Sequence, residues 1–360
     1  MALKIVKGRT LPIGVDLGTS SVKLAQLRRA DSEVELAAAA SADIPRDSQD
    51  KFSRRLDVAC KNIRVALKDQ PFRGRQAIIA VPAEQTFVQH VKIPKVAPGE
   101  VAAAVRNELS AKLPFPAETA VIRHVIAGDV QSDTEPRQEV IAVAAARKTL
   151  DAYLDMARKA KLDVVAINIE PCAIVECFGR LFRRAADAER TTLFIDMGTS
   201  STQVVLAHGN RIAFARNLSH GSRAIEQALA QAQQCDEKAA HELRGQMLSG
   251  ALDDEQVEQV YTACESPLDA LAAEMTQCMR YYESVFHGRR VDRAIFVGGL
   301  AYDKRLCQSL ARRLDLPAQI GDPLVRVKSA SGLETAIDRA GPQPGWAVAV
   351  GLSLGGSQAA

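Results

Sequence analysis

Short apolar runs of strand length alternate along this chain with longer segments in which apolar residues recur at helical spacing. Residues 77–81 and 164–169 are two such runs, and their length predicts buried strands. Between residues 49 and 68, Phe52, Leu56 and Ile63 fall on one face of a helix. Strands that alternate with amphipathic helices indicate an α/β fold.

One six-residue pattern, D-x-G-T-S-S, occurs twice in the chain. The copies span residues 16–21 and 196–201 and lie half the chain length apart. Each copy follows an apolar run and precedes a second β-prone run, 22–27 after the first copy and 203–207 after the second. A strand, a glycine turn and a second strand form a β-hairpin. The repeat therefore predicts two duplicated αβ domains, each of which opens on a hairpin.

The repeated turns carry residue types that suit a triphosphate and its metal ion. Glycine permits a tight bend and a close approach of the backbone to a ligand, and the amides and hydroxyls that follow can donate to phosphate oxygens. An aspartate at the end of the preceding strand can bind Mg²⁺, which prefers oxygen ligands. Stabilisation of a hairpin turn alone would explain one copy of the pattern, but two copies favour facing phosphate loops. The candidates are Asp16 and Asp196 for the metal, and Gly18, Thr19, Ser20, Ser21, Lys23, Gly198, Thr199, Ser200 and Ser201 for the phosphates.

A late glycine pair supplies a third candidate element. Residues 291–297 form an apolar run, Gly298 and Gly299 follow it, and a helix is expected from about residue 303 to 314. A strand that ends in two glycines before a helix lets a nucleotide lie against bare backbone near the helix N-terminus. Neither G-x-x-x-x-G-K-[ST] nor G-x-G-x-x-G occurs in the chain, so P-loop and dinucleotide sites lose their main support.

The rest of the pattern predicts a duplicated core with additions. From residue 85 the order changes to a strand, a helix, two strands around a polar loop, and a helix that ends near residue 161, which indicates an inserted α+β subdomain. Residues 222–288 are expected to be helical with breaks near Cys235, Gly250 and Pro267. The expected segments are domain 1 (1–84), the inserted α+β subdomain (85–163), the return to domain 1 (164–190), the second hairpin in domain 2 (191–216), a mainly helical subdomain (217–290), the return to domain 2 with the glycine pair (291–340), and a closing helix with tail (341–360).

Composition narrows the class of protein. Hydrophobic residues make up 47% and charged residues 25% of the 360 residues, and the net charge is +3. This balance is globular and too weakly basic to predict nucleic-acid binding. No apolar run approaches the roughly 20 residues that span a bilayer, and residues 1–10 lack the apolar core of a signal peptide. We therefore expect a cytoplasmic protein without direct membrane insertion, whose seven cysteines are packed and reduced.

The motifs together resemble those of the actin, Hsp70 and FtsA superfamily, which combine two D-x-G turns, a late Gly-Gly pair and a closing apolar helix, here at residues 346–352. Within it, the chain is most similar to the PilM family over essentially its whole length. Residues 13–23 (IGVDLGTSSVK) resemble that family's first phosphate motif, residues 166–171 (AINIEP) its connecting segment, and residues 113–116 (LPFP) its proline-aromatic stretch. The resemblance implies an actin-like ATPase fold of two duplicated αβ domains with an inserted α+β subdomain of the FtsA/PilM type.

The resemblance also implies a function. ATP and Mg²⁺ would bind between the halves, with Asp16 and Asp196 near the metal and Gly298 and Gly299 near the adenosine. The PilM proteins that this chain resembles act as cytoplasmic adaptors of type IV pilus assembly. They are recruited to the inner membrane because they bind the N-terminal cytoplasmic tail of PilN, in a groove beside the inserted subdomain. A PilN-like protein, other components of the pilus machinery and a second copy of the chain are therefore the expected partners.

One segment departs from the family pattern. The helix after the second hairpin usually carries Glu and Lys near the base and ribose, whereas the nearest match here, residues 240–244 (AHELR), has His241 and Arg244. Arg244 can donate to ribose or phosphate, but in a different geometry from lysine, and His241 is expected on the surface. A weakened nucleotide affinity is the predicted consequence.

Two other functions are compatible with the same superfamily. A sugar or acid kinase would need a carboxylate base within reach of the γ-phosphate, and Glu170 is the candidate catalytic residue. A filament former similar to FtsA would carry a C-terminal amphipathic anchor, and residues 355–360 do not have that pattern. ATP hydrolysis is expected to be slow at most.

Overall fold

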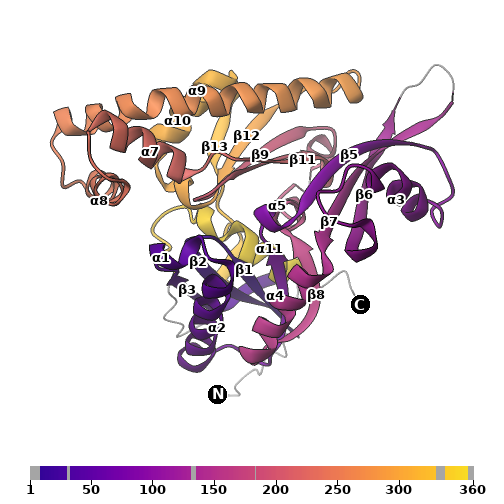
Figure 1. Cartoon of the computed structure of the whole chain (residues 1–360), viewed down its shortest axis with the longest axis horizontal. Coiled ribbons are helices and arrows are strands. Elements are labelled where there is room, and N and C mark those ends of the chain that lie inside the picture. The colour runs from indigo at the N-terminus through magenta and orange to yellow at the C-terminus, as the bar shows by residue number, and fades with distance from the viewer. Residues whose placement is uncertain (1–8, 31–32, 131–134, 183, 330–336, 356–360) are drawn as a thin grey trace, which may run out of the picture.

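The computed structural model describes residues 9–30, 33–130, 135–182, 184–329 and 337–355. These residues form three sheets with helices packed around them (Figure 1). The first half of the chain lies in the lower part of that view, the second half in the upper part, and the inserted sheet at the upper right. The predictions for residues 1–8 and for the tail from residue 356 lie outside the described residues.

The first half is built on a six-stranded sheet in the order β14-β3-β2-β1-β4-β8. Its strands are β1 (Arg9–Leu17), β2 (Ser21–Ala30), β3 (Glu33–Asp43), β4 (Gln76–Val81), β8 (Asp163–Ile169) and β14 (Val327–Ser329). α2 (Phe52–Asp69) and α4 (Arg147–Lys159) cover one face and share an apolar core with it. α5 (Glu170–Gly179) and α11 (Ala347–Gly355) cover the other face. The helix expected over residues 49–68 corresponds to α2, and the short α1 (Arg46–Gln49) precedes it.

The second half repeats this plan on a five-stranded sheet in the order β11-β10-β9-β12-β13. Its strands are β9 (Thr191–Met197), β10 (Thr202–His208), β11 (Arg211–Leu218), β12 (Arg293–Val297) and β13 (Ala318–Ile320). Its helices are α7 (Ser222–Ala232), α8 (Glu237–Leu248), α9 (Asp254–Val285) and α10 (Lys304–Leu314), after the short α6 (Ala185–Ala188). Short 3-10 helices follow the chain at η1 (Ala83–Gln85), η2 (Ala117–Thr119), η3 (Gly299–Tyr302) and η4 (Pro344–Trp346).

The two sheets share one topology. In each half the first strand pairs antiparallel with the next strand of the hairpin and parallel with a strand that follows later in the chain. The order β3-β2-β1-β4-β8 therefore corresponds strand for strand to β11-β10-β9-β12-β13. The duplicated αβ fold that the repeated motif predicted is confirmed.

The inserted subdomain is a three-stranded antiparallel sheet with one helix. Its strands are β5 (Phe87–Pro94), β6 (Ala120–Val130) and β7 (Arg137–Ala146), in the order β5-β7-β6, and α3 (Val101–Ser110) packs on them around a core of its own. The expected end of this subdomain at residue 163 is corrected, because Tyr153 and Met156 of α4 are buried in the core of the first half. A helical apolar pattern predicts one buried face without saying which sheet covers it.

The expected break at Pro267 is also wrong, whereas the breaks near Cys235 and Gly250 fall at the ends of α7 and α8. α9 continues through Pro267 as one helix of 32 residues. Proline inside a helix costs about 3 kcal/mol, since its ring removes one hydrogen bond. Cys264 and Leu268, on either side of it, are buried in one core, and this packing outweighs the local penalty.

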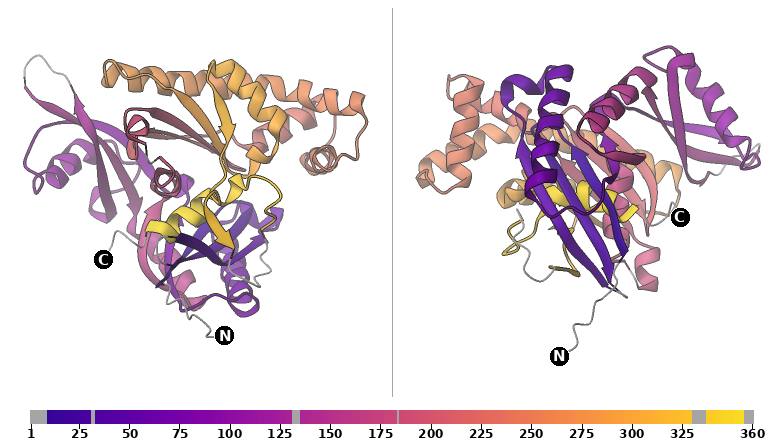
Figure 2. Two further views of the ribbon diagram at one scale, coloured as in Figure 1. Left: turned by 180° about the vertical axis from the view of Figure 1, so that it is seen from behind. Right: turned by 90° about the horizontal axis from the view of Figure 1, so that it is seen from below.

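The C-terminal helix α11 returns to the first half and crosses the middle of the molecule, between the two large sheets (Figure 2). It lies against the backbone of β1, where a Cβ on Gly14 would come within 2.0 Å of the Ala349 carbonyl oxygen. The Ser353 hydroxyl donates to the Pro12 carbonyl at 2.8 Å and accepts from the Leu27 amide at 3.1 Å. These contacts hold the base of the first hairpin in place.

Candidate functional site

A cavity of about 730 Å³ lies between the two halves, within the size range of small-molecule sites. The turn between β1 and β2 and the turn between β9 and β10 both line it. Its lining includes every residue that the sequence suggested for a metal, phosphate, nucleoside or catalytic role: Asp16, Gly18, Thr19, Ser20, Ser21, Lys23, Glu170, Asp196, Gly198, Thr199, Ser200, Ser201, Arg244, Gly298 and Gly299.

The two glycine turns meet directly across this cavity. The Thr199 hydroxyl donates to the Ser20 hydroxyl at 2.8 Å, and the Ser200 hydroxyl donates to the Thr19 hydroxyl at 3.3 Å. In the second turn, the Gly198 amide donates to the Ser201 carbonyl at 3.0 Å and closes the bend. Small hydroxyl side chains from both halves thus converge on one point of the cavity.

Three carboxyl groups line the same cavity near these turns. Asp16 and Asp196 lie near the ends of β1 and β9, and Glu170 begins α5. Burial and the neighbouring Asp16 raise the pKa of Asp196 to about 7. Burial also raises the pKa of Asp16, and that of Glu170 well above its usual value, while Lys23 opposes the shift at both aspartates. Three buried carboxyl groups thus face one nearby lysine, so their negative charge is only partly offset. This arrangement favours binding of a cation.

The donor set suits a magnesium nucleotide. Carboxylates and hydroxyls supply the hard oxygen ligands that Mg²⁺ prefers. Glycine turns with a lysine beside them are typical of phosphate sites. Within the described part of the chain, no three His, Cys, Asp or Glu side chains come close enough to hold a metal ion by themselves. A metal held by two aspartates together with phosphate and water matches this arrangement.

The end of β12 brings the glycine pair to the cavity wall. Gly298 has φ 87° and ψ 179°, a conformation that is essentially reserved for glycine. A Cβ at this position would lie 2.4 Å from the Asp196 carboxylate. A Cβ on Gly299, in contrast, would meet nothing within 4 Å. The backbone thus passes Asp196 closely and then borders open space, which is the surface that a flat nucleoside would need.

The opposite wall is formed by charged side chains from α7 and α8. Glu226 is only 3% exposed and accepts from His241 at 2.9 Å, and an Arg46 nitrogen lies 2.9 Å from its other oxygen. Arg244 is 6% exposed, lies 3.6 Å from Glu226 and keeps its Nε without a partner among the described residues. His241 borders the cavity, although its side chain is 62% exposed as the sequence suggested.

A family model described as type IV pilus assembly protein PilM matches residues 14–357. The chain belongs to this family. This PilM-family protein is thus an actin-like component of type IV pilus assembly. Within the described residues, no helix is both long and apolar enough to cross a membrane.

Two solved structures support the actin-like ATPase fold of this PilM-family chain. A PilM-PilN type IV pilus biogenesis complex is similar with a TM-score of 0.79 at 22% identity, over 96% of this chain and 98% of that chain. The ethanolamine utilization protein EutJ from Carboxydothermus hydrogenoformans is similar with a TM-score of 0.54 at 13% identity, over 96% and 89% of the two chains.

Glu170 lies at a junction of three parts of the PilM-family fold. Its Oε2 accepts from the side-chain amide of Gln203, on the second hairpin, and from the backbone amide of Ala83 at 3.2 Å. Ala83 belongs to η1, the last turn before the inserted subdomain. The candidate catalytic residue is therefore also a structural link from the cavity to the start of the insertion.

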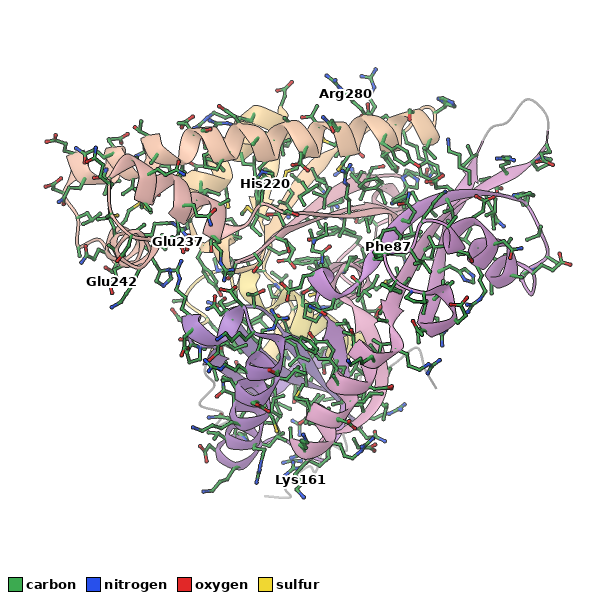
Figure 3. All side chains as sticks on the ribbon, viewed as in Figure 1. Phe87, Lys161, His220, Glu237, Glu242 and Arg280 are labelled. Carbon is green, nitrogen blue, oxygen red and sulfur yellow. The ribbon has the colours of Figure 1, made fainter. Side chains whose placement is uncertain are left out.

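Ion pairs that no sequence pattern predicted join α1 to α7 and α8 across the mouth of the cavity. Arg46 lies 3.3 Å from Glu237, and Arg223 lies 2.6 Å from Asp50. Figure 3 shows Glu237 on α8, which extends beyond the first half. No motif marks these residues, since their pairing depends on how the halves are placed. One signal was present: Glu226 lies next to Ile225 on the apolar face of a predicted helix, where a charge needs a partner.

Proposed function

We propose that this chain is a cytoplasmic, nucleotide-gated adaptor of type IV pilus assembly. It binds Mg-ATP in the cavity between its halves and the N-terminal cytoplasmic tail of a PilN-like inner-membrane protein on its first half. The reciprocal contact of the two glycine turns supports nucleotide binding most strongly, because a ligand between them touches both halves at once. The similar structure described as a PilM-PilN complex supports the partner.

Each group of cavity residues has a role in this proposal. Hydroxyls and amides of residues 18–21 and 198–201 bind the phosphates, and Lys23 adds a positive charge. Asp16 and Asp196 hold the Mg²⁺, whose charge offsets that of the triphosphate and of the two carboxylates. Gly298 and Gly299 border the adenosine, and Arg244 donates to ribose or phosphate. Since ATP contacts both halves, it favours their closed arrangement by its differential affinity.

Hydrolysis is expected to be slow at most. Glu170 is the carboxyl group that would orient an attacking water, and its Oε2 is already engaged by Gln203 and Ala83. Burial, with Asp196 and Asp16 nearby, raises its pKa well above the usual value, which favours the protonated form of this carboxyl group. A protonated carboxyl group accepts a proton poorly. Binding, rather than turnover, is therefore the proposed role of the nucleotide.

The edge strand β8 is the proposed docking site for the partner tail. Among the strands that the structure describes, β8 pairs with β4 alone, and its other edge offers main-chain groups to an extended peptide. Val165 is 48% exposed and Ile167 38% exposed on this strand. The strand ends at Ile169, which pairs with Val81, and the inserted subdomain begins a few residues after Val81. An extended apolar tail laid along β8 would thus lie beside the insertion.

Recruitment to the inner membrane follows from this partner. The PilN-like protein supplies the membrane attachment, and the adaptor remains on the cytoplasmic side. Other components of the pilus machinery and a second copy of the chain are further proposed partners. Sedimentation with Mg-ATP distinguishes the adaptor from a filament former, because a filament would appear in the pellet.

Peptide binding tests the partner. The expected result is saturable binding of a fluorescent peptide with the sequence of the cognate PilN tail, measured by anisotropy. Val165→Asp should weaken it by about tenfold or more, since it places a charge in an apolar contact worth about 1–2 kcal/mol. Val65→Asp is the matched control, because Val65 is 51% exposed on α2 of the same half. Equal affinity of the two variants would exclude β8 as the docking site, and no binding to the wild type would exclude the partner.

A further inference from the structure

The inserted subdomain is tethered to one half of the molecule but packs on the other. Both of its connections lead into the first half, at η1 after β4 and at the step from β7 to α4. Its sheet nevertheless packs against the second half. Ala127 and Val130 of β6 lie against the apolar core of that half, and Ile141 and Val143 of β7 belong to the central core that both halves share. In Figure 3, Phe87 marks the start of β5, where the insertion leaves the rest of the molecule. The insertion therefore bridges the two halves outside the nucleotide cavity.

A buried polar cluster fixes this packing. Glu139 on β7 is fully buried and accepts from the Tyr281 hydroxyl of α9 at 2.7 Å. The same oxygen lies 3.0 Å from Nδ1 of His90 on β5, whose Nε2 lies 3.2 Å from the Ala215 carbonyl oxygen of β11. The His90 ring also stacks on Phe214 with 4.5 Å between ring centres. We call Glu139, His90 and Tyr281 the Glu139 cluster.

The geometry of this cluster makes the docking specific. A buried carboxylate that loses its partners is costly, typically several kcal/mol, and the second oxygen of Glu139 already has no partner among the described residues. Sliding the insertion over β11 would break the bonds to Tyr281 and to Ala215 together. One docked orientation is therefore much more stable than its neighbours.

The connection from β4 to the insertion is short and begins beside the cavity. Ala83, at the start of the connection, donates to Glu170, and Glu170 also accepts from Gln203 of the second half. Gln203 follows the second glycine turn on β10, the strand that pairs with β11. If the second half moves relative to the first, it therefore displaces the insertion in two places. One is the contact with β11, and the other is the connection at Ala83.

We infer that the inserted subdomain moves with the second half when the cleft opens or closes, turning about its two connections to the first half. The space between the insertion and β8 then changes with the state of the nucleotide cavity. This inference rests on the proposed function, since it assigns to the Glu139 cluster the coupling between the nucleotide and the partner tail. By reciprocity, tail binding changes nucleotide affinity by the same factor.

The test compares the affinity of the fluorescent PilN-tail peptide with and without a saturating non-hydrolysable ATP analogue and Mg²⁺. Couplings between sites commonly change affinity about 5- to 150-fold, so we expect a ratio of at least about fivefold for the wild type. The double variant Glu139→Gln/Tyr281→Phe should bring this ratio to within about twofold of unity while both ligands still bind. Tyr261→Phe is the matched control, because it removes a hydroxyl-to-carboxylate bond of 2.9 Å from the same helix, with both partners in the second half.

The outcomes separate the inference from the function on which it rests. Loss of peptide or nucleotide binding in the wild type overturns the proposed function. A wild-type ratio of one overturns the nucleotide gating in the proposed function together with the inference. A double variant that keeps the wild-type ratio overturns the inference alone. Hydrogen exchange supplies a readout without nucleotide: amides of residues 87–93 should exchange faster in the double variant, and unchanged exchange contradicts the inference. If the double variant does not fold, Tyr281→Phe alone is used, since Tyr281 is 37% exposed.

Discussion

Thr199 and Ser20 form a hydrogen bond of 2.8 Å between the two halves, and Ser200 and Thr19 form its counterpart. Because the two turns have the same sequence, each threonine pairs with the serine next to the other threonine, as expected for a pseudo-twofold axis between the turns. A polyphosphate on this axis would receive equivalent donors from both halves. The duplication thus has a direct consequence for ligand binding.

The backbone at Gly298 should tolerate no side chain. Gly298→Ala forces a Cβ to within 2.4 Å of the Asp196 carboxylate at φ 87°, and we expect a loss of about 2–4 kcal/mol in the free energy of unfolding. Gly299→Ala is the control, since its Cβ meets nothing within 4 Å. Urea unfolding monitored by circular dichroism measures both. Similar stability of the two variants would contradict the position of β12 against Asp196.

Stability should depend on pH through Asp196. Its pKa of about 7 in the folded chain lies above the ordinary value of 3.8, so between these values the folded state holds a proton that the unfolded state has lost. Folding stability therefore falls as pH rises through this window. Asp196→Asn removes the effect, and its stability relative to the wild type should rise by on the order of 1–3 kcal/mol from pH 4 to pH 7 and then level off. A difference that stays constant over this range would show that Asp196 titrates normally.

The ion pairs at the mouth of the cavity should slow nucleotide release. Asp50 pairs with Arg223 across the halves and does not itself line the cavity, so Asp50→Asn tests the closure without touching the ligand. Partly exposed pairs contribute about 0.2–1 kcal/mol, which predicts release that is roughly two- to fivefold faster, and a smaller difference in high salt. Release of a fluorescent ATP analogue in a stopped-flow instrument gives the rate.

The control for this prediction is Glu258→Gln. It breaks the pair between Glu258 and Arg305, whose two contacts are both 2.6 Å and whose partners both belong to the second half. Its release rate should equal that of the wild type. If Asp50→Asn behaves like this control, the contacts between α1 and α7 do not hold the cleft closed.

Pro267 within α9 should lower the free energy of unfolding. Pro267→Ala restores a helical amide, and we expect unfolding to require about 1–3 kcal/mol more. Pro267 is partly exposed, so the smaller side chain leaves little empty space. Chemical denaturation checks the sign. A less stable variant would mean that the proline positions the buried residues on either side of it.

The sequence predicted most of what is local. Both D-x-G-T-S-S turns, the strands around them and the strand before Gly298 were recovered because glycine and alternating apolar residues fix conformation within a few residues. Their convergence in one cavity followed from the duplication. The partner sheet of α4, the continuity of α9 through Pro267 and the pairs around Glu226 could not be predicted, because each depends on contacts between segments far apart in the chain.

The same reasoning explains why the Glu139 cluster was not foreseen. Glu139 stands at the start of an apolar run that predicts a strand, and a charged residue at such a position is usually solvent-exposed. Only the docking of the insertion on β11 and α9 brings His90 and Tyr281 to it. Charged residues that flank apolar runs are thus the positions where tertiary contacts add most to a sequence-based prediction.

A crystal structure of the chain with Mg-ATP tests the central claim most directly. We predict the triphosphate between residues 18–21 and 198–201, with the metal ion beside Asp16 and Asp196 and the adenosine against Gly298 and Gly299. A triphosphate bound by one turn alone, or density for the nucleotide outside this cavity, would contradict the claim that both halves bind one nucleotide.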